Sequence, residues 1–321
     1  MLIQALTLVL ALAPKRLSLN VLWIFHPPRE ADELLISDCM SDSWTPVIYR
    51  FSGAGNDFVV LDGRQGGMEA FREADRIGQL CREYHTDGLM ILGAAPGADF
   101  AMEFYNPDGS GGMMCGNGGR CIVAFADYLG LCPADGRTWH FLAPDGWHTA
   151  EILDRQERGD PPLLSIWTVR LKMIDVEGIT DMKDGLFLNT GTRHYVQFVP
   201  DVENLDMDLE ARPIRWDPAF APEGTNVNFV QEAEDGLHVR TFEKGVEGET
   251  LACGTGLTAS AIAWYAQRKA AKPDPAGREG TPVSVLLQCR RGDWLRVEFT
   301  PQPDGRFTDV YLTGPAELQN T

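Results

Sequence analysis

Short apolar or alternating segments, separated by turn residues, begin near residue 47 and continue along the chain. Runs of this kind predict β-strands, whereas apolar residues three and four apart predict helices. The spacing predicts helices at 68–84, 120–129 and 257–268. Strands are predicted within 47–62 (two strands) and at 89–92, 100–105, 164–172, 186–189, 194–199, 227–231, 237–242, 283–289, 294–299 and 308–312. Many short strands around few helices favour an α+β fold.

The chain's 321 residues are enough for two domains. Residues 154–162 are charged and end in two prolines, which predicts a linker between them. We expect an N-terminal domain at 47–160 and a C-terminal domain at 161–304. Residues 305–321 are a candidate segment to complete the first domain.

Residues 1–46 do not continue this periodic pattern. The apolar run at 1–13 has no basic residue before it, whereas a secretory signal has its basic residues first. The run is also too short to span a bilayer. We expect 1–46 to be an extension outside the fold, either disordered or the product of a misassigned start, with Met40 as a natural start.

Composition and charge narrow the functional classes. Hydrophobic residues make up 44% and charged residues 23%, as in ordinary globular proteins. The formal net charge of −18 argues against nucleic-acid and anionic-membrane partners, because such a surface repels phosphate groups. Seven cysteines are too few for a disulfide scaffold and odd in number, which favours free thiols in a reducing compartment, the cytoplasm.

One short motif occurs twice. Cys115 is followed by Gly-Asn-Gly and Cys253 by Gly-Thr-Gly, and each motif precedes a predicted helix. Each half also has an asparagine-rich strand entry, at 56–59 and 226–230. The repetition predicts two similar domains that face each other across a cleft.

A thiol at a helix start has a distinctive chemistry. The unpaired N–H groups and the helix dipole favour negative charge there, so they can lower the pKa of a thiol and bind a carboxylate. Thiols on opposite sides of one carbon could remove a proton from one face and return one to the other, which inverts a stereocentre. Cys115 and Cys253 would then titrate as a coupled pair.

Other interpretations remain open for these residues. An isolated cysteine near a helix start is most often a small buried hydrophobic residue. A zinc site is poorly supported, because Cys115 and Cys121 have no second Cys/His pair at ligand spacing. A Cys115–Cys253 disulfide would consume both acid/base groups. His194 and Glu243, taken alone, are more often structural.

Several segments together resemble one family. They are Gly-Ala-Gly-Asn-Asp-Phe at 53–58, Tyr-Asn-Pro-Asp-Gly-Ser at 105–110, Met-Cys-Gly-Asn-Gly-Gly-Arg-Cys at 114–121, Pro-Glu-Gly-Thr-Asn-Val-Asn-Phe at 222–229 and Glu-Thr-Leu-Ala-Cys-Gly-Thr-Gly at 249–256. In this order they resemble the diaminopimelate epimerases, amino-acid racemases that work without pyridoxal phosphate. Related proline and hydroxyproline racemases have His at the position of Asn117, so the diaminopimelate branch is favoured.

The resemblance implies a fold and a set of roles. The implied fold is α+β, with two similar domains, each a curved, mostly antiparallel sheet around a central helix, and the active site in the cleft between the domains. Cys115 and Cys253 match the acid/base cysteines, and His194 and Glu243 match residues that modulate their pKa. The implied substrate-binding residues are Asn56, Asn106, Gly116, Asn117, Thr192, Asn226, Glu243, Lys244, Gly254 and Thr255.

The chain departs from the family pattern at a few positions. Lys244 stands where the family usually has Arg, and it keeps the charge but loses the planar fork of donors. Thr192 replaces an Asn found in many members. The chain ends at Thr321, before a final aromatic strand linked to dimerisation in relatives. These differences concern substrate detail and assembly more than the type of reaction.

The expected function is epimerisation of LL-2,6-diaminopimelate to the meso form, in lysine and peptidoglycan precursor synthesis, without metal or cofactor. The expected partners are this small-molecule substrate and a second copy of the chain, a homodimer, but no nucleic acid or membrane. The alternatives are a proline- or hydroxyproline-type racemase and a non-catalytic amino-acid-binding relative. A thiol redox protein is disfavoured because Cys-x-x-Cys is absent.

Overall fold

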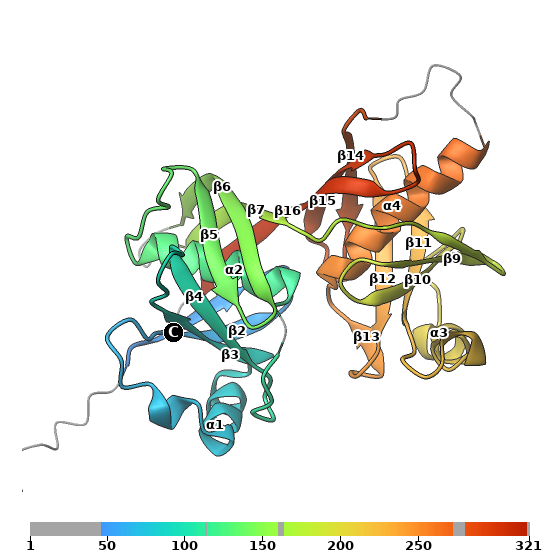
Figure 1. Cartoon of the computed structure of the whole chain (residues 1–321). Helices are drawn as coiled ribbons and strands as arrows, with labels where there is room; N and C mark the ends of the chain where they lie inside the picture. Colours follow the sequence, from blue (N-terminus) through green and yellow to red (C-terminus); the bar gives the residue numbers. More distant parts are fainter. Residues whose placement is uncertain (1–45, 113, 160–163, 272–279, 320–321) are drawn as a thin grey trace, which may run out of the picture. The chain divides into compact units, whose positions relative to one another are not determined.

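The structure, a computed structural model, describes residues 46–112, 114–159, 164–271 and 280–319. The expected extension at 1–46 falls outside these residues, apart from Pro46. The strands form a continuous sheet in which β16 (Phe307–Gln319) is central. Figure 1 shows β16 running from the strands around one helix, α4, to those around another, α2.

The strands of the first half follow the order of the sequence and close on themselves. They are β1 (Ile48–Ser52), β2 (Asp57–Asp62), β3 (Gly88–Gly93), β4 (Phe100–Tyr105), β5 (Thr138–Ala143), β6 (Gly146–Arg158) and β7 (Leu164–Lys172). The ring is closed by the strand β16, which pairs with both β7 and β1. The resulting ring of strands surrounds α2 (Gly116–Tyr128), whose residues Gly116 to Ala126 are buried.

The second half repeats this connectivity around α4 (Gly254–Ala271). Its path leads from β16 through β15 (Trp294–Pro301), β14 (Val283–Gln288), β12 (Leu237–Glu243), β11 (Asn226–Glu232), β10 (Arg193–Phe198) and β9 (Gly185–Asn189) to β8 (Thr180–Met182), while β13 (Gly248–Thr250) pairs with β12. In each half a surface helix, α1 (Ala74–Tyr84) or α3 (Met207–Arg215), connects two parallel strands, and the central helix precedes the strand of a second parallel pair. The expected α+β fold with two similar halves is confirmed.

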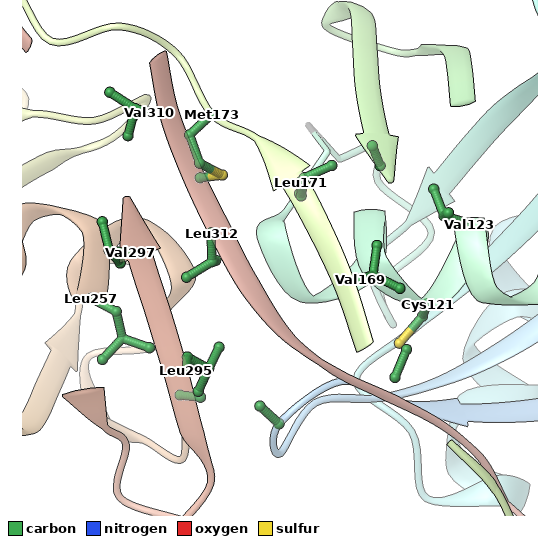
Figure 2. Close-up of a cluster of buried hydrophobic side chains, with 14 of the residues drawn as sticks. Cys121, Val123, Val169, Leu171, Met173, Leu257, Leu295, Val297, Val310 and Leu312 are labelled. Carbon is green, nitrogen blue, oxygen red and sulfur yellow. The ribbon is translucent and has the colours of Figure 1, made fainter. Parts of the chain in front are cut away.

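Small and apolar side chains allow the central helices to be enclosed. Figure 2 shows Cys121 and Val123 of α2 and Leu257 of α4 among strand residues that include Leu171 and Leu312. A helix that is apolar on every side is stable only when it is covered all round. The two helix starts are therefore fixed by a packed core.

The structure corrects several predicted element boundaries. The helix predicted at 68–84 is a short 3-10 turn at Glu69–Phe71 followed by α1, because Glu73 is extended and begins a new helix. The expected linker at 154–162 is wrong for 154–158, which belong to β6 and pair with β7. Residues 160–162 of that linker lie outside the described residues. The two central helices begin three or four residues earlier than the predicted 120 and 257.

Candidate active site

Cys115 is the N-cap of α2. Its backbone is extended, with φ −96° and ψ 149°, and its Sγ accepts a hydrogen bond from the N–H of Gly118 at 3.1 Å. A methyl group on Gly118 would lie 3.2 Å from this sulfur, so glycine allows the close approach. The sulfur thus occupies the position at which a helix start accepts a polar side chain.

Cys253 holds the equivalent place before α4. Its Sγ lies 3.4 Å from the hydroxyl of Thr255, and the backbone N–H of Gly256 favours its thiolate. Only 8% of the residue is exposed, whereas Cys115 is partly exposed. The two cysteines therefore share a local geometry, as the repeated motif predicts.

The two helix starts touch each other. A methyl group at Gly254 would lie 3.5 Å from Cα of Gly116 and 2.9 Å from Cδ2 of Leu312. Nearby, the side-chain amide of Asn117 lies within 3.4 Å of the carbonyl oxygen of Ala252. Because Gly116 and Gly254 directly follow the cysteines, the positive ends of both helix dipoles meet at one place.

Burial raises the pKa of both thiols, which overturns the lowered value expected from the helix starts. Loss of hydration is the largest effect at each sulfur, and it outweighs the hydrogen bonds from the helix N–H groups. The carboxylate of Glu243 raises both pKa values further, whereas Arg120 lowers that of Cys115. A thiolate formed here is a stronger base than a solvated one.

Glu243 lies at the end of β12, beside Cys253. Its carboxyl accepts a hydrogen bond from the Thr250 hydroxyl, and it lies close enough to the Cys253 thiol for each group to affect the pKa of the other. Burial raises the pKa of Glu243 above its ordinary value. From this position its charge acts on the Cys253 thiol.

His194 on β10 is fully buried behind the Thr255 side of the site. Its Nε2 lies 2.9 Å from the hydroxyl of Thr192 and 3.0 Å from that of Thr255. Burial lowers the pKa of His194 to about 3, so the ring is neutral near pH 7. It reaches Cys253 through Thr255, not by direct contact.

The predicted substrate-binding asparagines fall into different surroundings. The Oδ1 of Asn56 accepts a hydrogen bond from Nδ2 of Asn117 at 2.5 Å. Asn226 lies beside Thr192, and its Oδ1 accepts from the backbone N–H of Lys244 at 2.8 Å. These residues are linked by contacts to one or the other helix start. By contrast, the hydrogen bonds of Asn106 stay within its own loop, to Ser110 and Gly109.

The predicted cation for the substrate, Lys244, has a partner in the protein. Its Nζ donates to the carbonyl oxygen of Glu223 at 2.8 Å. The carboxylate of Glu223 in turn pairs with Arg193 at 2.6 Å. The ammonium group also acts electrostatically on the Glu223 carboxylate, but its hydrogen bond is to a carbonyl oxygen, so its charge can still meet a second anion.

The sequence did not reveal two buried polar residues that form hydrogen bonds with residues of the site. Arg120 has no exposed surface and donates to Oδ1 of Asn117 at 2.9 Å and to the carbonyl oxygen of Gly116 at 3.1 Å. Asn228, also fully buried, contacts the His194 ring. An arginine within an otherwise small and apolar helical segment was the available signal for the first. Asn228 lies in the asparagine-rich strand entry at 226–230, but that pattern did not distinguish it from Asn226 or indicate a role for it.

No group of three or more His, Cys, Asp or Glu side chains within the described ranges could hold a metal ion. Within the same ranges, no helix is long and apolar enough to cross a membrane.

Comparisons with known proteins give matches along most of this chain. A family model described as diaminopimelate epimerase matches residues 49–153 and 186–280. The protein named diaminopimelate epimerase from Flavobacterium psychrophilum is 37% identical over 84% of this chain and 97% of its own length. That from Aquifex aeolicus is 38% identical over 83% and 93%.

Solved structures with the same fold are more distant in sequence. A Bacillus anthracis phenazine biosynthesis protein of the PhzF family has a TM-score of 0.58 at 11% identity, covering 85% of this chain and 96% of its own. A probable proline racemase from Agrobacterium radiobacter has a TM-score of 0.54 at 17% identity, covering 86% and 93%. At these identities the likeness concerns the fold alone.

Proposed function

The chain belongs to the diaminopimelate epimerase family, and from this premise we propose that it is an isomerase that converts LL-2,6-diaminopimelate to meso-diaminopimelate. The observation that carries the proposal is the contact between Gly116 and Gly254, which puts the starts of the two cysteine-bearing helices together. An enzyme that inverts a carbon without a cofactor needs an acid and a base on opposite faces, and this arrangement supplies a matched pair of thiols.

In the proposed reaction one cysteine acts as thiolate and the other as thiol. The thiolate removes the α-hydrogen from one face of the reacting carbon, and the thiol gives its proton to the opposite face. Either direction of the reaction uses both Cys115 and Cys253, with their roles exchanged. The raised pKa of the thiols suits this task, because a more basic thiolate is a better match for a very weak carbon acid.

The reacting carboxylate would lie at the two helix starts. The N–H groups of Gly116, Asn117, Gly254 and Thr255 belong to first turns, whose N–H groups have no partners within their own helix. Converging dipoles would stabilise the negative charge that develops on the carboxylate as the proton leaves. The same groups serve both directions of the reaction, since the carboxylate stays in place.

The rest of the substrate would be held by the polar residues around the cysteines. Asn56, Asn106, Asn226 and Thr192 would bind the distal amino-acid end, and Lys244 would pair with its carboxylate. Asn117 would keep Asn56 in place through their hydrogen bond. Glu243 would modulate the pKa of Cys253, which it contacts, and bind the substrate.

The proposal includes the setting of the enzyme. We propose that the reaction serves lysine and peptidoglycan precursor synthesis in the cytoplasm, and that the enzyme is a homodimer that uses neither a metal nor an organic cofactor. The net charge of −18 supports the absence of a nucleic-acid partner.

A comparison of substrates tests the proposal. The purified chain would be incubated separately with LL-diaminopimelate, L-proline, L-alanine and L-glutamate, and the stereoisomers separated by chiral chromatography. We expect inversion of diaminopimelate at one centre and little turnover of the others, because a site built for a second charged end leaves its polar groups unpaired with a shorter substrate. Efficient racemisation of proline with diaminopimelate untouched would instead assign the chain to the proline-type racemases.

A further inference from the structure

We propose that Asn228 is a positioning residue that fixes the tautomer of His194 and thereby directs the hydroxyl proton of Thr255 onto the sulfur of Cys253. The inference rests on the proposed function only for its purpose, which is to stabilise the thiolate of Cys253. The proton positions follow from matching each hydrogen-bond donor around His194 with an acceptor.

The orientation of the Asn228 amide is determined by its neighbours. Its Nδ2 lies 2.9 Å from the carbonyl oxygen of Tyr195, which can only accept a hydrogen bond. Its Oδ1 lies 3.0 Å from the hydroxyl of Thr241, which donates to it. The opposite orientation would bring two oxygens together at 2.9 Å, so Nδ2 must face Tyr195.

The same nitrogen also faces the His194 ring. Nδ2 of Asn228 lies 3.0 Å from Nδ1 of His194. Because Nδ2 is a donor, Nδ1 must accept and therefore carries no proton. The ring is neutral, since burial lowers its pKa to about 3, and its single proton is then on Nε2.

A protonated Nε2 can only donate. It faces the hydroxyl oxygens of Thr192 and Thr255 at 2.9 Å and 3.0 Å, so neither hydroxyl can donate to the ring. Thr192 also lies within 3.4 Å of Nδ2 of Asn226, a further donor. The hydroxyl protons must find acceptors elsewhere.

The remaining contacts give those protons a direction. The hydroxyls of Thr192 and Thr255 are 3.0 Å apart, and Thr255 lies 3.4 Å from Sγ of Cys253. If Thr192 donates to Thr255, and Thr255 donates to Cys253, every donor of this cluster has an acceptor. In the reverse direction the proton of the exposed Thr192 would go to solvent and the sulfur would lose its donor, so a negative charge on Cys253 favours the direction toward the sulfur.

Cys253 is consequently placed between a donor and an acceptor. Thr255 can donate to the thiolate, and the carboxylate of Glu243 can accept from the thiol. Glu243, the Cys115 thiol and His194 are the titratable groups that act on this sulfur or its donor. One sulfur can thus have a hydrogen-bond partner in each protonation state, as an acid that becomes a base requires.

The tautomer can be measured in the unaltered protein. Nitrogen-15 NMR of histidine-labelled full chain at pH 7 distinguishes protonated from unprotonated ring nitrogens, and a His194→Gln sample identifies the signals that belong to His194. We expect Nε2 to carry the proton and Nδ1 none. A proton on Nδ1, or a doubly protonated ring, would overturn the inference.

Alkylation tests whether the Thr255 hydroxyl acts on the sulfur. The rate of Cys253 modification by iodoacetamide would be followed against pH in the absence of substrate, with the Cys253 peptide resolved by mass spectrometry from the other cysteines. In Thr255→Val we expect the pKa of Cys253 to rise by about 1, since a hydrogen bond to a charged group is lost. Thr255→Ser keeps the hydroxyl and is expected to restore the original profile.

These outcomes separate the inference from the proposed function. An unchanged alkylation profile in Thr255→Val would refute the role of the hydroxyl even in an active epimerase. A shifted profile rescued by serine would support the role even if diaminopimelate were not turned over, because neither measurement uses the substrate.

Discussion

Cys115 and Cys253 precede helices whose first residues touch, and the proposed reaction needs both sulfurs in every turnover. Replacement of either by alanine removes an acid in one direction and a base in the other. We expect Cys115→Ala and Cys253→Ala each to lower kcat/KM by at least about 1,000-fold. Cys132→Ala, at an exposed loop cysteine, serves as the control and should retain full activity. Near-normal turnover by either test variant would remove that thiol from the mechanism.

Lys244 tests how the distal end of the substrate is recognised. Its Nζ hydrogen-bonds a carbonyl oxygen and acts electrostatically on the Glu223 carboxylate, and its charge can also serve a substrate carboxylate. We expect Lys244→Met to lower kcat/KM for diaminopimelate by about 10- to 100-fold, the effect of losing a charged hydrogen bond. Lys244→Arg should stay within a few-fold of the original, because it keeps the charge. Steady-state kinetics of the pair would decide, and a fully active Met variant would exclude this role.

At the scale of elements, α4 can approach β11 only because Gly256 has no side chain. A methyl group there would lie 2.4 Å from Oδ1 of Asn228 and 3.2 Å from the hydroxyl of Thr241, both on strands. Gly256→Ala should therefore displace the helix start, lower the free energy of unfolding by about 1–3 kcal/mol and reduce activity at least about 10-fold.

The control for this substitution is Gly93→Ala at the end of β3. A methyl group at Gly93 has no atom within 4 Å, and its backbone is outside the left-handed region. Denaturant unfolding and kinetics of both variants make the comparison. Equal behaviour of the two would show that the close approach at Gly256 does not matter.

Local pattern predicted most strands but placed the helix starts too late. Glycines at 116, 118, 254 and 256 are poor helix formers, so the sequence read as loop before each helix. They are helical because the packed core fixes the helix starts. They are glycines because the close contacts leave no room for a larger residue. The helix α3 escaped prediction for a similar reason, since Pro213 lies inside it.

The site residues divide in the same way, into those that a sequence motif indicates and those whose role depends on tertiary packing. The cysteines were predicted because their motif recurs, and His194 and Glu243 because the segments resemble a family. Asn228 could not be assigned a role, since a buried amide is defined by partners distant in the sequence. The direction of the thiol pKa values was also missed, because burial is a tertiary property that a helix-start motif does not reveal.

At the scale of the whole molecule, Arg120 joins segments that are far apart in the sequence. From α2 it donates to the carbonyl oxygens of Gly53, after β1, and Pro315, in β16, as well as to Asn117. Arg120→Met would leave these buried acceptors unpaired, and we expect the free energy of unfolding to fall by about 3 kcal/mol or more. The sequence suggested that residues 305–321 could complete the first domain, but it did not show that β16 pairs with both β1 and β7, because this pairing joins the two ends of the fold.

Urea denaturation checks this prediction against a surface arginine. Arg306 pairs with Asp304 in an exposed turn, so Arg306→Met should change the stability by less than about 1 kcal/mol. If Arg120→Met and Arg306→Met had the same free energy of unfolding, the hydrogen bonds of Arg120 would not stabilise the contact between these segments.

The most direct test of the two-thiol account is the fate of the α-hydrogen in deuterated water. LL-diaminopimelate would be incubated with the chain, and product and remaining substrate analysed by mass spectrometry at early times. Since the base and the acid are different sulfurs, we expect deuterium at the inverted carbon of the meso product while the remaining substrate stays unlabelled. Product without deuterium, or substrate that exchanges as fast as product forms, would contradict a mechanism in which Cys115 and Cys253 act from opposite faces.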